Sequence, residues 1–361
     1  FPCSKHIHAA RLTAQYPSQR PALAGAAGLM GKGVPTHAGR GRPPPEPETV
    51  LRGHMSGVQA LAVTDNEAML FSGDADGDLR VWDLETARSV STTRVGNAGA
   101  GVTSINLAPD STMLLSQSRD GAAQVFRRAP DGALRREGEI STGSYNFCRV
   151  SVLWNSGANM LGPLEDDLQP CTGHLSSALL ATAGSDPAVI EVWSLHNRLK
   201  VLELSQPGPS MGMCMALQLF CPAGLPDSPH VLAGYEDGTV SLWDCSSAAS
   251  PLCTLPHLHS EPVMGLALDS TASGAVSCSA GHTVTVTSIN RAGVEDTPLS
   301  VLHSVDLTRP GASTVAIRPD KKIFAVGGWD SHVWIYKYPK CKPLACLQYH
   351  SAGVTDVQFS M

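Results

Sequence analysis

The stretch Leu51–Asp83 reads LRGHMSGVQALAVTDNEAMLFSGDADGDLRVWD and decides the fold of the chain. A Gly-His pair precedes a segment with alternating apolar residues, a second segment ends in Ser-Gly, and an Asp-Gly turn leads into a third that ends in Trp-Asp. Alternation with a period of two is typical of β-strands, and Asp-Gly is favoured in two-residue hairpin turns. The stretch therefore predicts three consecutive antiparallel strands.

The same ending recurs along the rest of the chain. The successors of Trp82 in this position are Phe126, Trp193, Trp243, Thr287 and Tyr336, at steps of 44, 67, 50, 44 and 49 residues. A repeat period in the forties is typical of a WD-repeat β-propeller, in which each blade is a four-stranded antiparallel sheet. The one long step predicts an inserted loop, which we place at about residues 156–177.

The number of repeats predicts an all-β, seven-bladed WD-repeat β-propeller over residues 48–361. Six repeats are complete, and a seventh begins at His350 and reads HSAGVTDVQFS before Met361. Because a full repeat takes about 40 residues, we expect the last blade to be truncated relative to the functional protein. In such rings the first strand completes the last blade, and residues 49–52 are placed to do so.

Residues 1–47 differ from the repeats in composition. They are rich in Ala, Gly, Pro and Arg, show no periodicity, and contain no acidic residue before Glu46. An acid-free basic segment fits an organelle transit peptide, and it also fits a disordered tail or an upstream-translated stretch. We predict a disordered tail.

Several polar residues recur at fixed places in the repeat. By resemblance to WD repeats, the first blade carries the buried Trp–Ser–His–Asp hydrogen-bond tetrad of that fold, with the members His54, Ser72, Asp76 and Trp82. Three further aspartates occupy the same turn as Asp76, namely Asp120, Asp237 and Asp330. An aspartate repeated in blade after blade indicates a structural role, since acid–base catalysis requires one unusual site.

Composition excludes several classes of function. A net charge of −6 gives no basic footprint for nucleic acid, and the longest apolar runs are too short to span a membrane. The ten cysteines form no C-x-x-C pair, which argues against zinc and disulfides and favours the cytoplasm and nucleus. His257, His259 and Glu261 suit turn structure better than a metal site. No catalytic motif occurs, so we expect no enzyme activity and no cofactor.

Four stretches go beyond the generic repeat. They read SYNFCR (Ser144–Arg149), LAGYEDGTVSLWD (Leu232–Asp244), HSEPVMGLALDS (His259–Ser270) and VAIRPDKKIFAVGGWD (Val315–Asp330). Over residues 48–361 the chain resembles the G-protein beta-subunit-like family, whose fungal members are called ASTRA-associated proteins. The resemblance implies a scaffold that works with the Triple T co-chaperone complex in the maturation of phosphatidylinositol-3-kinase-related kinases.

Binding residues concentrate on loops, and interface anchors are often aromatic residues or arginine. We therefore predict a partner-binding site at Tyr145, Phe147 and Arg149, with Tyr235, Glu236 and Trp329 as further candidates. Two alternatives stay open, a Gβ-like signalling subunit and a ubiquitin-ligase substrate receptor. The first requires a coiled-coil helix that residues 1–47 lack, and the second typically has Trp-Asp-x-Arg where this chain has Trp82-Asp-Leu-Glu85.

Overall fold

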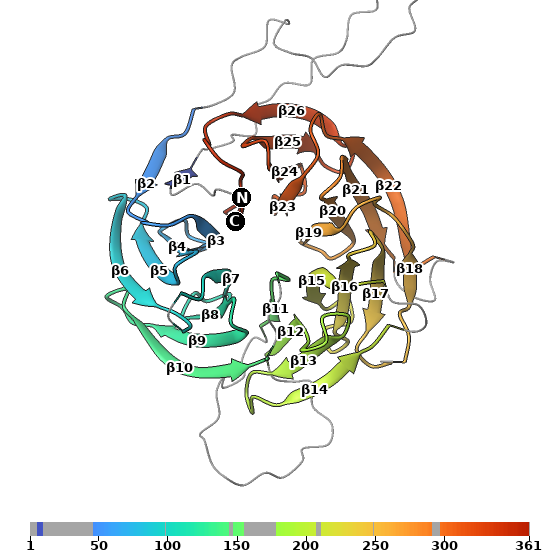
Figure 1. The fold of residues 1–361 in the computed structure, drawn as a ribbon, viewed down its shortest axis with the longest axis horizontal. Coiled ribbons are helices and arrows are strands. Elements are labelled where there is room, and N and C mark those ends of the chain that lie inside the picture. Colours follow the sequence, from blue (N-terminus) through green and yellow to red (C-terminus); the bar gives the residue numbers. More distant parts are fainter. Residues whose placement is uncertain are drawn as a thin grey trace, which may run out of the picture.

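The strands of the chain are arranged in a ring of sheets. The computed structural model describes residues 6–9, 46–97, 99–143, 147–154, 178–206, 211–247, 249–290 and 297–360. These residues form 26 β-strands and no helix, which confirms the all-β fold class. Six four-stranded antiparallel sheets, here called blades 1 to 6, follow one another around the ring, and a two-stranded sheet lies between blades 6 and 1 (Figure 1).

Blades 1 to 3 cover the first half of the ring. Blade 1 consists of β3 (Val58–Val63), β4 (Met69–Asp74), β5 (Asp78–Asp83) and β6 (Arg88–Arg94). Blade 2 consists of β7 (Val102–Leu107), β8 (Met113–Ser118), β9 (Ala122–Arg128) and β10 (Leu134–Ser141). Blade 3 consists of β11 (Ser151–Leu153), β12 (Leu179–Ala183), β13 (Ile190–Ser194) and β14 (Lys200–Leu204).

Blades 4 to 6 cover the second half. Blade 4 consists of β15 (Cys214–Phe220), β16 (His230–Tyr235), β17 (Val240–Asp244) and β18 (Cys253–Leu255). Blade 5 consists of β19 (Val263–Leu268), β20 (Gly274–Ser279), β21 (Thr283–Ile289) and β22 (Leu299–Asp306). Blade 6 consists of β23 (Ala312–Ile317), β24 (Ile323–Gly328), β25 (Val333–Lys337) and β26 (Lys342–Leu347). The predicted insertion at 156–177 lies outside the described residues.

The apolar core lies between neighbouring blades. The middle strands β8, β16 and β20 are buried along their whole length, because other blades cover both of their faces, whereas the outer strand β6 is mostly exposed. Between blades 1 and 2, for example, Phe71 packs in one cluster with Leu114 and Phe126. Similar clusters join every following pair up to blades 5 and 6.

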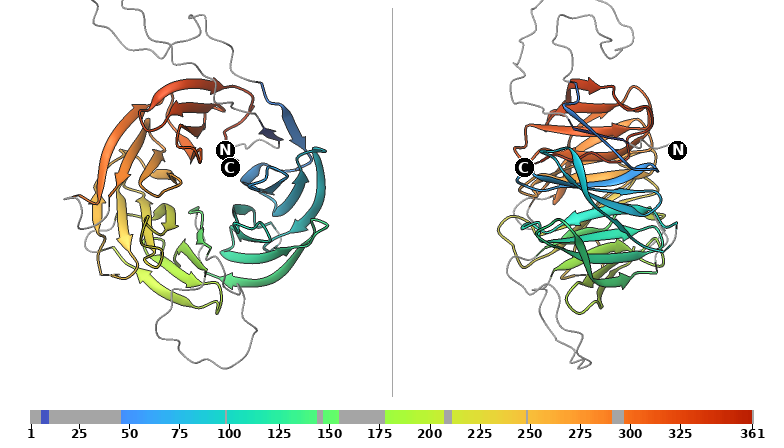
Figure 2. Two further views of the ribbon diagram at one scale, coloured as in Figure 1. Left: turned by 180° about the vertical axis from the view of Figure 1, so that it is seen from behind. Right: turned by 90° about the vertical axis from the view of Figure 1, so that its left-hand side faces the viewer.

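The ring has two faces, which Figure 2 shows from behind and from the side. Successive connections of an antiparallel sheet alternate between its two ends. The blade-to-blade loops, such as residues 53–57, and the β4–β5 turn at 75–77 therefore lie on one face, here called the loop face. The turns at 64–68 and 84–87 lie on the opposite face, here called the turn face.

The prediction of seven blades is wrong for the described residues, which form six. At the seventh position, strand β2 (Thr49–Arg52) pairs with β1 (His6–Ala9), and Ile7 of β1 is buried beside Leu51. The sequence did not predict β1, which corrects the tail prediction for these four residues. The segment 354–360 runs along the inside of this position without forming a strand. Among the described residues, its one backbone–backbone hydrogen bond to a strand is from Val354 N–H to the carbonyl of Gly328 in β24, at 3.0 Å.

The buried tetrad of blade 1 is present with one different member. Trp82 Nε1 donates to Ser72 Oγ at 2.7 Å, Ser72 Oγ lies 2.7 Å from His54 Nε2, and His54 Nδ1 lies 2.8 Å from a carboxylate oxygen of Asp74. The prediction of Asp76 as the acidic member is therefore wrong. Asp76 is exposed in the turn, and its backbone N–H donates to Asp74 at 3.0 Å.

Burial and hydrogen bonding act in opposite directions on Asp74. Burial alone would raise the pKa of this carboxyl, but the hydrogen bond and charge of His54 and the backbone N–H groups of Asp78 and Asp76 hold it below the usual range. The predicted turn aspartates Asp120 and Asp237 each accept hydrogen bonds from neighbouring residues of their own turns. Asp330 accepts one from the backbone of the same turn.

Replacement of Asp74 and of Asp76, each in its own variant, should show which aspartate belongs to the tetrad. We expect Asp74→Asn to lower the free energy of unfolding by about 1–3 kcal/mol, because it breaks a buried hydrogen-bond network. Asp76→Asn is the matched control and should change it by less than about 0.5 kcal/mol. Urea unfolding of both variants measures the difference, and equal losses would contradict this assignment.

Blade 5 keeps the histidine of the tetrad without its acid. His259 Nε2 lies 2.8 Å from Ser277 Oγ, as His54 does from Ser72, but the residue that corresponds to Asp74 in the strand register is Ser279. Burial without a carboxylate lowers the pKa of His259 to about 4. The folded protein therefore holds this imidazole neutral where the unfolded chain, with a pKa near 6.5, binds a proton.

This histidine should make stability dependent on pH. The folded pKa lies below the unfolded one, so its contribution is complete above about pH 6.5 and is lost as the pH falls toward about 4. The variant His259→Asn has no group that titrates at this position. As the pH falls from about 6.5 to about 4, the free energy of unfolding of wild type should therefore fall by up to about 3 kcal/mol more than that of the variant. Urea unfolding as a function of pH measures it, and a constant difference would refute the assignment.

Candidate functional site

The residue Phe147 projects from the loop face beside the centre of the ring. It lies in the loop that leads into β11, and 69% of its side chain area is exposed. The guanidinium of Arg119, from the β8–β9 turn, lies 5.6 Å from the centre of its ring, within cation–π distance. Blades 2 and 3 together thus present an aromatic ring backed by a cation. Met55 and Met213 add exposed apolar side chains to the same face.

We call Phe147 and Arg119 together the platform. A cavity of about 260 Å³ lies beside them, in the centre of the ring. Its lining comes from blades all around the ring and includes Gln59, Thr103, Met215, Gly265 and Ser313. The inner strands of the blades form its wall, and Phe147 and Arg119 lie at one side of it. Phe147 and Arg119 are therefore supported by the inner strands that surround the centre of the ring.

Arg149 crosses this cavity and binds within the molecule. One nitrogen of its guanidinium lies 2.8 Å from the carboxylate of Asp356, and the other donates to the backbone carbonyls of Gln59 at 3.0 Å and Thr355 at 2.6 Å. The Asp356 side chain is 3% exposed, and it also accepts the backbone N–H of Leu61 at 2.8 Å. Arg149 therefore connects blade 3 to blade 1 and to the segment 354–360.

The other four predicted binding residues differ in their environments. Tyr145 lies outside the described residues. Tyr235 is fully buried, and its hydroxyl accepts the indole N–H of Trp243 at 3.2 Å, so its prediction as a binding residue is wrong. Glu236 is exposed on the loop face, where its carboxylate accepts the backbone N–H of Met213. Trp329 is partly buried, and its ring covers the backbone at Gly311.

Sequence reasoning missed Arg119. The sequence contains only a weak signal for Arg119, because Arg119 and Phe147 belong to different blades. Only the arrangement of the blades in a ring brings the two side chains together.

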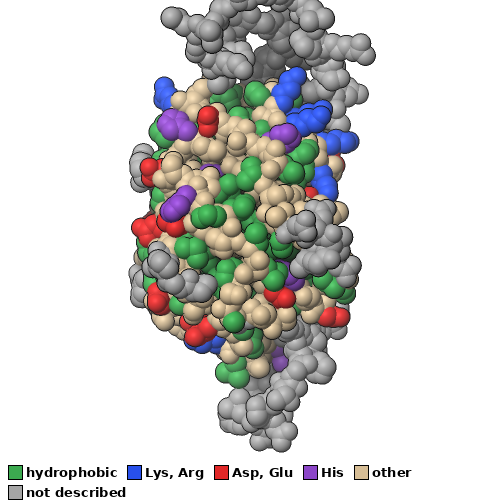
Figure 3. Space-filling model, turned by 90° about the vertical axis from the view of Figure 1, so that its right-hand side faces the viewer, with side chains coloured by type: hydrophobic (Ala, Val, Ile, Leu, Met, Phe, Trp, Pro, Cys, Tyr) green, Lys and Arg blue, Asp and Glu red, His purple; other side chains and the backbone are tan. Residues whose placement is uncertain are grey.

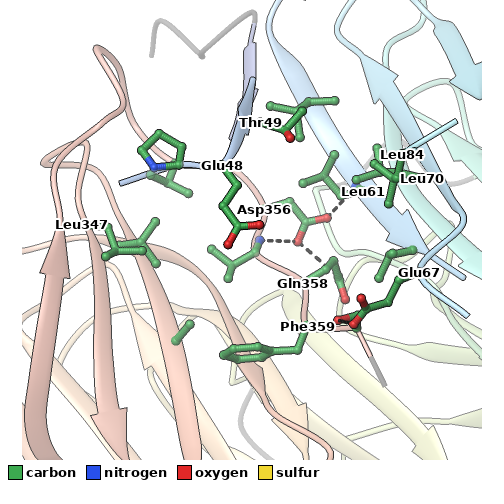
Figure 4. A pocket seen from close by; sticks show the side chains of 18 of the residues that line it. Glu48, Thr49, Leu61, Glu67, Leu70, Leu84, Leu347, Asp356, Gln358 and Phe359 are labelled. Atoms are coloured by element: carbon green, nitrogen blue, oxygen red, sulfur yellow. Dashed lines mark hydrogen bonds between the residues drawn. The ribbon is translucent and has the colours of Figure 1, made fainter. Parts of the chain in front are cut away.

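A larger groove of about 1110 Å³ opens between blades 6 and 1, at the seventh position. Figure 4 shows Leu61, Leu70 and Leu84 of blade 1 on one side, Leu347 of blade 6 on the other, and Phe359 of the inner segment between them. The apolar cores of the two blades remain separate clusters here. The groove thus marks the one junction in the described ring where two neighbouring blades share no core.

The histidines and cysteines of the described residues lie in different environments. No group of three or more His, Cys, Asp or Glu side chains in this part of the chain is placed to hold a metal ion. His257 is exposed, whereas His259 is buried. Burial raises the pKa of Cys278 to about 12, and a hydrogen bond with Cys148 together with burial raises that of Cys214. The described part also contains no helix able to cross a membrane.

The ring of four-stranded blades and the Trp–Ser–His–Asp tetrad define a WD-repeat β-propeller protein, and the family model "WD domain, G-beta repeat" matches residues 45–83 and 219–244. "Guanine nucleotide-binding protein subunit beta-like protein 1" of Mus musculus is 33% identical over 88% of this chain and 91% of the mouse chain. "ASTRA-associated protein 1" of Verticillium alfalfae is 29% identical over 91% and 82% of the two chains, and that of Schizosaccharomyces pombe is 25% identical over 87% and 93%. The chain belongs to this G-protein beta-subunit-like family, which confirms the predicted resemblance.

Removal of the Arg149 side chain should release the inner segment. We expect Arg149→Met to raise amide hydrogen exchange of residues 354–360 roughly thirtyfold, which corresponds to a loss of about 2 kcal/mol after discounting for the partial exposure of Arg149. Hydrogen–deuterium exchange with mass spectrometry measures it. Phe147→Ala is the control and should leave this segment unchanged; unchanged exchange in Arg149→Met would show that other contacts hold the segment.

Proposed function

We propose that this chain is a non-catalytic protein-interaction scaffold that acts with the Triple T co-chaperone complex in the maturation of phosphatidylinositol-3-kinase-related kinases. The observation that carries the scaffold role is the exposed platform of Phe147 and Arg119 on the loop face. Aromatic and arginine side chains are the commonest anchors of protein interfaces. The cytoplasm and nucleus are the proposed compartments.

The surroundings of the platform support this role. Shared apolar clusters join blades 1 to 3, so the loops that carry Phe147 and Arg119 have a packed support. A rigid site loses little conformational entropy when it binds a partner. The names of the fungal relatives refer to association with ASTRA, which supports a role within a larger assembly.

A Gβ-like signalling subunit is the second candidate function. The name of the mouse relative, guanine nucleotide-binding protein subunit beta-like protein 1, favours it. The two candidates differ in their partners, because a signalling subunit requires a Gγ-like chain. Affinity purification of the full chain followed by mass spectrometry therefore separates them.

The platform can be tested in the same experiment. Wild type should recover Triple T subunits and the large kinases, and Phe147→Ala should weaken this recovery by on the order of tenfold, because it removes an exposed anchor without disturbing the core. Val90→Ala is the matched control, since Val90 is exposed on the outer strand β6. Equal recovery by both variants would remove Phe147 from the site, and recovery of a Gγ-like chain would refute the co-chaperone role.

A further inference from the structure

Blade 6 concentrates positive charge in a protein whose net charge is negative. Between residues 318 and 342 there are six lysines and arginines, Arg318, Lys321, Lys322, Lys337, Lys340 and Lys342, and only two acidic residues, Asp320 and Asp330. Figure 3 shows Lys and Arg side chains gathered at the upper right of the molecule. This density of cations is not balanced by acids of the same blade.

Two of these six cations are used within the fold. Arg318 forms an ion pair with Asp320 at 2.7 Å, and Lys321 reaches Asp269 of blade 5 at 3.3 Å. The other four, Lys322, Lys337, Lys340 and Lys342, are exposed, and we call them the lysine patch. Lys322 has only a distant ion pair of 3.7 Å with Asp320, and the other three have no ion pair with any carboxylate in the described part of the chain.

The strand register places two of these lysines side by side, because Lys337 of β25 lies directly opposite Lys342 of β26. Lys322 directly precedes Ile323 of β24, which pairs with Lys337 on its other side. Lys340 lies in the turn between β25 and β26. Neighbouring strands are about 4.8 Å apart, so three strands span about 10 Å, which an extended peptide covers with about three residues.

This arrangement is unfavourable for the isolated fold. Like charges directly opposite each other on neighbouring strands destabilise a sheet. Lysines on an outer edge strand also prevent edge-to-edge aggregation, but that explanation applies only to Lys342, because β25 is paired on both sides and the other two lie in or beside turns. The fold itself therefore does not explain the other three lysines, which are exposed to solvent and accessible to a partner of opposite charge.

We propose that the lysine patch is a second interaction surface that binds an acidic segment, rich in Asp and Glu, of a partner protein. The turns at 318–322 and 338–341 belong to the turn face, whereas Phe147 lies on the loop face. The two surfaces thus lie on opposite faces of the ring. One molecule can hold two partners at once.

The test uses the full chain and a fluorescein-labelled peptide of glutamates, with the same peptide of glutamines as reference. Wild type should bind only the glutamate peptide, and the affinity should fall steeply with rising salt. A variant with all four substitutions, Lys322→Gln, Lys337→Gln, Lys340→Gln and Lys342→Gln, removes the charges and keeps part of each aliphatic stem. It should lose affinity by on the order of tenfold or more. Fluorescence anisotropy measures both.

A matched control removes four exposed cations elsewhere. Arg88, Arg127, Arg135 and Arg136 lie on blades 1 and 2, and two of them are paired with Glu137 and Glu139. Their replacement by Gln should leave peptide binding within about twofold of wild type. Equal loss in both variants would show a general charge effect and overturn the proposal, as would preferred binding of duplex DNA or of phosphatidylserine vesicles over the peptide.

Two further measurements separate binding from structure. The single variant Lys337→Gln should unfold at the same or a higher temperature than wild type, because it removes a repulsion, whereas a structural lysine would lower the unfolding temperature. Phe147→Ala should bind the glutamate peptide normally. If the lysine patch does not bind the peptide, the proposal for Phe147 on the loop face is unaffected. If Phe147→Ala does not weaken partner recovery, the proposal for the lysine patch is unaffected.

Discussion

Burial of both apolar faces of each blade between two neighbours is the constraint on which the whole ring depends. A single four-stranded sheet exposes two apolar faces, and stacking around a ring covers them. Blades 2 to 5 have both faces covered by shared clusters. Blades 1 and 6 each have one face toward the groove at the seventh position, where strands β1 and β2 and the segment 354–360 provide partial cover.

This incomplete junction explains the role of Arg149. A strand inside a sheet is held by backbone hydrogen bonds along its length, but the segment 354–360 forms no such ladder. The guanidinium of Arg149 and the carboxylate of Asp356 replace it with side-chain bonds to two carbonyls and two backbone N–H groups. Arg149 uses these donors inside the molecule, which leaves Phe147 as the exposed residue among the described part of the motif, residues 147–149.

The repeat period predicted the propeller, because alternation and turn residues report directly on strands. The same repetition misled the assignment of single residues. Asp76 shares its Asp-Gly turn with other blades, so comparison between repeats favoured it, whereas the buried Asp74 ends strand β4 and corresponds to Ser118 in blade 2. Tyr235 stands next to a turn in sequence, yet it ends a buried strand. Contacts between blades, such as Arg119 with Phe147, depend on the ring itself.

The two proposed surfaces differ in the physics of their binding. An aromatic platform gains affinity mainly by excluding water, which salt affects little, whereas exposed lysines act through charges that salt screens over about 8 Å at physiological ionic strength. The contacts of the aromatic platform chiefly set the dissociation rate of a partner, whereas the charges of the lysine patch chiefly set the association rate. Because the ring separates them on opposite faces, occupation of one surface leaves the other open. A rigid propeller with these two faces can retain one protein while it exchanges another.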